Sequence, residues 1–191
     1  MMPHVQALYC HGSSLGTVVK VELKSNVRYY QRNLVASGEK LQEMFSTTKN
    51  DIGSADLMMY MAAEPSACNQ WGCSGTLGIA YVGVVCNPYA AKYKQSINEW
   101  RQTHAEAGHT IAHEFGHNLG MSHDFSEKHS ASGCDMTGIM SYGPPINQWS
   151  ACSKADFQAH YIANKDKWCM EGNCFIKVIK RLMTVIKSSC A

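Results

Sequence analysis

The segment from His113 to Asp124 combines the residue types and the spacing of a metal site, and it reads HEFGHNLGMSHD. The residues before it, from about Ala105, are compatible with a helix and include no proline. On a helix, His113 and His117 lie about one turn apart on the same face, so their imidazoles can bind one metal ion. Glu114 points partly toward the same side and can reach a water bound to that metal. We therefore expect a metal centre with a carboxylate beside it.

The residues that follow this helix predict a third ligand. Gly120 can adopt the left-handed conformation of a sharp turn without a Cβ penalty. The turn returns the chain toward the metal and delivers His123 as a third nitrogen. Three neutral imidazoles leave the fourth tetrahedral position of Zn2+ open for water, which is the arrangement of a catalytic zinc site. His109 is on the same helix face and is a candidate fourth ligand, but we favour a position farther along the helix, because the turn to His123 fixes the metal.

This pattern, HExxHxxGxxHD, resembles the zinc motif of the metzincin metalloproteases. Asp124, directly after the third histidine, resembles the adamalysin (reprolysin) branch, which includes the ADAM and snake-venom metalloproteases. GIMSYG at residues 138–143 resembles the Met-turn of that family. The resemblance implies that Met140 forms a hydrophobic floor beneath the metal. It also implies that Asp124 is a buried acceptor that braces the local fold and is not a ligand.

The resemblance implies an α/β (α+β) fold, with a mixed twisted sheet, a long active-site helix, a zinc cleft and a small irregular C-terminal subdomain. Apolar periodicity predicts matching elements in the same order. The strands expected from this pattern are Thr17–Leu23, Asp56–Ala62 and Gly75–Val85, and the expected helices are Gly38–Lys49 and Ser153–Trp168 with Ser153 as N-cap. The resemblance adds a short inner strand at Ser96–Glu99, which leads into the active-site helix. The family's catalytic domain begins with a further strand and helix, for which this chain has no residues. We therefore expect a partial catalytic domain over residues 1–174.

The nine cysteines favour disulfides formed in an oxidising compartment, and hence a secreted or extracellular protein. The first residues lack the apolar core of a signal peptide, which suggests a chain that is incomplete at its N-terminus. The resemblance implies the bridges Cys86–Cys169 and Cys134–Cys152, and Cys68–Cys73 could close a local loop. Connectivity stays open at this point, and three cysteines have no assigned partner: Cys10, Cys174 and Cys190.

The expected partner is a protein or peptide substrate. The resemblance implies that it binds extended and antiparallel along the Gly75–Val85 edge strand, through main-chain hydrogen bonds.

Seventeen basic and fifteen acidic side chains nearly balance, and nothing in that balance suggests nucleic acid. The tail over residues 175–191 carries a basic amphipathic pattern at 175–187, which can lie on a membrane surface, pack on the domain, or be non-native sequence. Gly172 replaces a calcium-binding Asn of the family, with Asn173 one residue on, which leaves Ca2+ doubtful.

These observations predict a zinc-dependent metalloendopeptidase. Zinc held by the three histidines would lower the pKa of a water toward about 7. Glu114 would accept its proton as general base and give it to the leaving amine. The alternative is a catalytically impaired fragment that acts as a non-catalytic binding module, because a complete zinc motif can stand in an incomplete scaffold.

Overall fold

The computed structural model describes a core of the chain and several shorter stretches around it. The described residues are 2–10, 15, 19, 21, 38–48, 56–62, 68–69, 72–73, 76–100, 103–129, 134, 137–142 and 146–167. Among these residues, no helix has the length and the apolar character needed to cross a membrane.

A mixed three-stranded sheet lies at the centre of the described part, with the strand order β1-β5-β4. β5 (Gln95–Glu99) pairs parallel with β1 (Met58–Ala62) and antiparallel with β4 (Gly78–Ala80). Every residue of β5 is buried, because strands flank it on both sides and helices cover both faces of the sheet. A separate two-stranded ribbon joins β2 (Cys68–Asn69) to β3 (Gly72–Cys73). This mixed α/β arrangement confirms the predicted fold class.

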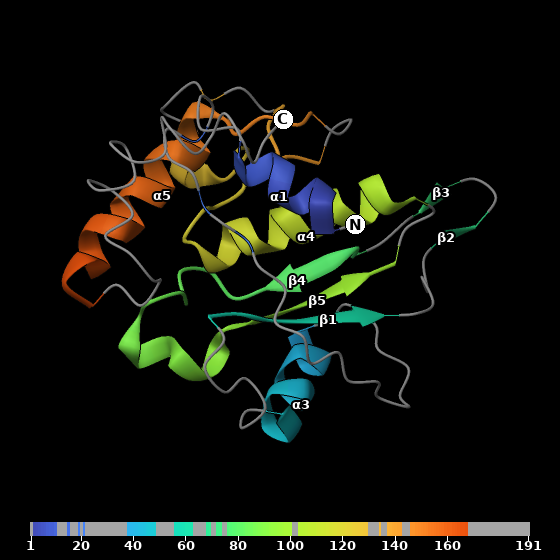
Figure 1. Cartoon of the computed structure of the whole chain (residues 1–191), viewed down its shortest axis with the longest axis horizontal. Helices are drawn as coiled ribbons and strands as arrows, with labels where there is room; N and C mark the ends of the chain where they lie inside the picture. The colour runs from blue at the N-terminus through green and yellow to red at the C-terminus, as the bar shows by residue number, and fades with distance from the viewer. Residues whose placement is uncertain are drawn as a thin grey trace.

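One face of the sheet is covered by α3 (Gly38–Thr48), which agrees with the predicted helix (Figure 1). Its apolar positions Leu41 and Met44 are three residues apart and therefore lie on one side of the helix. They pack against Tyr60 of β1 and Ile97 of β5 in a small core cluster.

The opposite face carries α4 (His104–Asn118), the longest described helix (Figure 1). A capping box fixes its start: the Thr103 hydroxyl accepts the Glu106 N–H, and the Glu106 carboxylate accepts the Thr103 N–H. The helix is buried from Ala107 almost without a break, because it lies between the sheet and a second helix.

That second helix is α1 (Met2–Cys10), which the sequence patterns did not predict. Its side chains Val5, Leu8 and Tyr9 belong to the main core cluster. The Tyr9 hydroxyl donates to the carbonyl of Ala112 in α4 at 2.9 Å, and Trp149 Nε1–H donates to the carbonyl of Leu8 at 2.9 Å. The described start of the chain therefore supports the central helix from the side away from the sheet.

The helix predicted from Ser153 begins earlier, as α5 (Ala151–Asn164), and the predicted N-cap is wrong. Ser150 is the N-cap, and its hydroxyl accepts the Ser153 N–H at 3.0 Å. Short 3-10 helices complete the described elements: η1 (Pro88–Tyr93), η2 (Glu127–His129) and η3 (Lys165–Lys167).

Two predicted strands differ from the structure. Thr17–Leu23 lies mostly outside the described residues, and Val19 and Val21 are in neither a helix nor a strand. Of the predicted strand Gly75–Val85 the structure describes residues 76–85, and among these only β4 is a strand, because the chain then turns toward the end of α4. The N–H groups of Gly83 and Val85 donate to the carbonyls of His117 and Asn118 instead of continuing the ladder.

Candidate metal centre and active site

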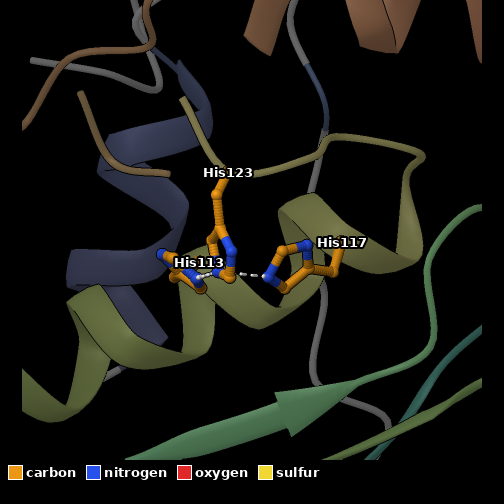
Figure 2. Close-up of side chains that lie close together, drawn as sticks. All are labelled: His113, His117 and His123. Carbon is orange, nitrogen blue, oxygen red and sulfur yellow. Dashed lines mark hydrogen bonds between the residues drawn. The ribbon is translucent and has the colours of Figure 1, made fainter. Parts of the chain in front are cut away.

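Three imidazoles meet beside the C-terminal half of α4. His113 and His117 project from the helix, and His123 reaches them from the segment that follows (Figure 2). His123 Nε2 lies 3.1 Å from His117 Nε2 and 3.2 Å from His113 Nε2. One ligand atom from each side chain lies within 4.8 Å of the others, and His109 is not part of this group.

Main-chain carbonyls set the orientation of the two helical rings. His113 Nδ1–H donates to the carbonyl of Ile139, and His117 Nδ1–H donates to that of Met121, each at 2.8 Å. A carbonyl can only accept, so these nitrogens carry the protons and each Nε2 keeps its lone pair. Burial, with further contributions from neighbouring histidines, lowers the pKa of His113 to about 3 and that of His117 to about 4. Both rings are therefore neutral at physiological pH.

The nitrogen atoms fit a zinc ion. Tetrahedral Zn2+ with bonds of about 2.0–2.1 Å places its nitrogen ligands about 3.3 Å apart, close to the 3.1 and 3.2 Å that separate His123 Nε2 from the other two Nε2 atoms. Converging lone pairs repel one another unless a cation lies between them. The three neutral imidazoles are also the donor set of a site that leaves one position open.

Gly120 makes the turn that brings His123 to this group. Its φ is +95°, and its N–H donates to the carbonyl of His117 at 2.9 Å. A Cβ at this position would lie 2.5 Å from Cβ of His160 in α5, so both the conformation and the space require glycine. His160 is itself held by a 2.7 Å hydrogen bond from Nε2 to the carbonyl of Val85.

The turn around Met140 packs directly against α4. Met140 is fully buried, and a Cβ on Gly116 would lie 2.5 Å from its sulfur. Met140 therefore lies next to the turn of α4 that carries His117. The residue before it, Ile139, orients His113 through its carbonyl.

Asp124 ties this turn to α5 through a buried carboxylate. It accepts hydrogen bonds from the hydroxyls of Ser141, Ser150 and Ser153. Its own N–H donates to the carbonyl of Met140 at 3.1 Å. The carboxylate points into this serine cluster and is not part of the histidine group.

Glu114 lies in α4 beside the first histidine and is almost fully buried. Burial raises its pKa to about 8. Its Oε2 is buried and has no hydrogen-bond partner among the described residues, so its capacity to accept a proton is not used within them. A Cβ on Gly78 of β4 would lie 2.4 Å from Oε1 and 2.7 Å from Cγ of Glu114. The carboxylate therefore rests on the backbone of the edge strand.

Sequence reasoning missed Gly78, and it also missed two aromatic side chains at the site. The Phe125 ring stacks on His123 at 4.7 Å, and Tyr142 contacts both rings at 4.6 and 4.8 Å. Both side chains are exposed apolar groups. The signal was present in the sequence, because Phe125 and Tyr142 lie two residues after a predicted ligand and a predicted Met-turn methionine, respectively.

The structure joins Cys134 to Cys152 by a disulfide, and it contains a disulfide at Cys86. The backbones of Cys68 and Cys73 are register partners across the β2–β3 ribbon. Cys169, Gly172, Asn173 and the tail at 175–187 lie outside the described residues. The Cys86–Cys169 pairing, the calcium site and the membrane contact therefore stay predictions, as does the domain boundary at residue 174.

Comparisons with known proteins point to one family. A model of the reprolysin (M12B) family of zinc metalloproteases matches residues 56–173. The snake venom metalloproteinase fibrolase of Macrovipera lebetinus is 35% identical over 97 residues, covering 50% of this chain and 46% of that protein. A zinc metalloproteinase-disintegrin-like protein of Cerberus rynchops is 39% identical over 92 residues, covering 46% and 14% respectively. The chain thus spans less than half the length of these relatives.

A solved structure described as a chaperone–substrate complex contains a chain with a similar fold. It aligns with a TM-score of 0.52 at 16% identity and covers 87% of this chain and 29% of that one. The likeness concerns the fold alone. The family match covers the three histidines, Glu114 and Met140 within residues 56–173, and the chain belongs to the reprolysin (M12B) family of zinc metalloproteases.

Proposed function

We propose that this chain is a zinc metalloendopeptidase that hydrolyses internal peptide bonds of proteins. The observation that supports it most is the convergence of three neutral imidazole nitrogens beside a buried carboxylate. Family membership supports the reaction class. Beyond family membership, we propose that the site of this chain itself catalyses that reaction.

His113, His117 and His123 would hold the metal through their Nε2 atoms. Bound zinc would supply a Lewis acid that polarises a carbonyl and lowers the pKa of water. The carbonyls of Ile139 and Met121 keep two of the rings in the tautomer that this requires.

Glu114 is the proposed general base and then the general acid. Its carboxylate accepts a proton from the attacking water and delivers that proton to the nitrogen of the leaving amine. Burial, which holds the pKa of Glu114 near 8 without metal, favours the protonated state. A positive charge nearby favours the carboxylate. The two influences oppose each other, which suits a group that must take up a proton and release it in one cycle.

The substrate would bind as an extended strand along β4. Within the described sheet β4 pairs on one side only, with β5, so its other edge can accept a peptide. Gly78 of that strand touches the Glu114 carboxylate, which would place a bound peptide next to the proposed base. The strand is short, so we expect the main-chain contacts to concentrate near residues 78–80.

The disulfides of the chain support secretion. Cys134–Cys152 and the bridge at Cys86 would form in an oxidising compartment. We therefore propose an extracellular site of action.

Glu114→Ala tests the proposal. We expect the variant to keep one equivalent of zinc, because the three ligands remain, and to lose at least about 100-fold in turnover of a denatured protein substrate. His104→Ala is the matched control, since this exposed histidine begins the same helix away from the site. Wild-type protein that binds zinc but cleaves nothing would overturn the proposal and favour a non-catalytic binding module.

A further inference from the structure

His123 is the least restrained of the three histidines. His113 and His117 sit on a buried helix, and each ring is fixed through Nδ1 by a carbonyl. His123 lies beyond the helix and is only half-buried. Among the described residues its Nδ1 has no hydrogen-bond partner, and its ring stacks on the partly exposed Phe125. Its position therefore depends on what holds its main chain.

The main chain of His123 is held by His129, which ends η2. His129 Nδ1–H donates to the carbonyl of His123 at 2.8 Å. The Ser126 N–H donates to the same carbonyl at 3.0 Å, and the Ser126 hydroxyl lies 3.2 Å from His129 Nδ1. The imidazole of His129 is only 5% exposed, so water does not compete strongly for this bond.

Asp156 of α5 completes the arrangement from the other side. Its Oδ2 accepts the N–H of Ser122, the residue before His123, at 2.9 Å. The same oxygen lies 3.1 Å from His129 Nε2, at ion-pair distance though without hydrogen-bond alignment. Lys128 Nζ donates to Oδ1. One buried carboxylate thus contacts the Met121–Ser122 peptide group, one residue before His123, and the imidazole that binds the peptide group following His123.

We propose that His129, supported by Asp156, is a positioning residue that fixes the main chain of His123 and thereby sets the zinc affinity of the site. The inference rests on the proposed zinc site. It gives a role to a histidine that has no place in the ligand pattern of the sequence and touches no reacting group. Loss of an outer group that holds a metal ligand typically costs about 10- to 100-fold in affinity.

Zinc affinity of the full chain tests this inference, measured by competition with a chromophoric chelator at a temperature where each variant is folded. His129→Leu keeps the approximate volume and removes both nitrogens, and we expect its zinc dissociation constant to rise about 10- to 100-fold. His129→Asn places an amide nitrogen where Nδ1 lies, and it should recover most of that loss. His104→Leu, which removes an exposed histidine, should bind zinc like the wild type.

The outcomes separate this inference from the proposed function. Wild-type protein that binds no zinc contradicts the zinc site itself. Wild-type protein that binds zinc, together with an unchanged dissociation constant in His129→Leu, contradicts only the role of His129. A purely structural role would lower the melting temperature of the metal-free chain without weakening zinc binding to the folded state. If His129→Leu does not fold, His129→Asn must bind zinc more tightly than His129→Gln, whose amide lies at the Nε2 position, and the reverse order overturns the inference.

Discussion

Gly78 offers a way to move the proposed base without touching a metal ligand. A methyl group at this position would lie 2.4 Å from Oε1, 2.7 Å from Cγ and 2.8 Å from Cδ of Glu114. Ordinary contacts of a Cβ begin near 3.4 Å. Because Cγ as well as the terminal oxygen is too close, a small rotation of the carboxylate cannot remove the overlap. In Gly78→Ala the carboxylate must therefore shift by about 1 Å.

A shift of about 1 Å in a catalytic group can cost about 100-fold in rate. We therefore expect Gly78→Ala to lower kcat/KM by about 100-fold, which corresponds to about 2.7 kcal/mol of transition-state stabilisation. Zinc content should stay at one equivalent, because the three heavy atoms nearest to the added methyl group all belong to Glu114, which is not a proposed ligand. The assay is steady-state cleavage of an internally quenched peptide, with zinc measured on the same samples.

A double-mutant cycle with Glu114→Asp makes the test sharper. Aspartate is one methylene shorter, so its carboxylate lies farther from position 78. Gly78→Ala should then cost little further activity in the Glu114→Asp background, and the two losses should not add. Full activity in Gly78→Ala, or strictly additive losses in the double variant, would refute the contact as the reason for glycine.

Two further predictions concern stability. Tyr9→Phe removes the buried hydrogen bond to the carbonyl of Ala112 and should lower the free energy of unfolding in denaturant by about 1 kcal/mol, whereas Tyr89→Phe at an exposed site should change nothing measurable. The pKa of Glu114, raised from 4.5 to about 8 in the native chain, means that the native state binds the proton more tightly than the unfolded state, so stability falls as pH rises through that window. Between pH 6.5 and 8 the metal-free wild type should lose about 1.6 kcal/mol relative to Glu114→Gln, because the contributions of His113 and His117 are common to both proteins and cancel in the comparison. Parallel pH curves for the two proteins would contradict this.

The elements that carry the site could be predicted because their signals are local. A few adjacent residues carry these signals: the helical spacing of the first two histidines, the glycine after the helix and the third histidine. They are enough to predict α4, the turn at Gly120 and the group of three histidines. β5 was also predicted, although its residues QSINE include one apolar side chain and show no alternation, because the resemblance placed a strand before the helix.

What the sequence could not predict depends on contacts between distant segments. β4 is shorter than expected because the carbonyls at the end of α4 take the N–H groups of Gly83 and Val85. Ser150 and not Ser153 caps α5, since the two serines share the buried Asp124 carboxylate and only the folded arrangement decides between them. The packing of α1 on α4 is equally non-local.

In the proposed function, one zinc ion held by His113, His117 and His123 is required for peptide hydrolysis by this chain. The most direct measurement is a titration of zinc into the chelator-treated protein while cleavage of an unstructured protein is followed by mass spectrometry. We expect cleavage to be absent without metal, to rise in proportion to added zinc and to saturate at one equivalent per chain, with no cleavage at any zinc level in Glu114→Ala. Cleavage that persists in the metal-free chain, or a zinc-loaded wild type that leaves the protein substrate intact, would contradict the proposed function.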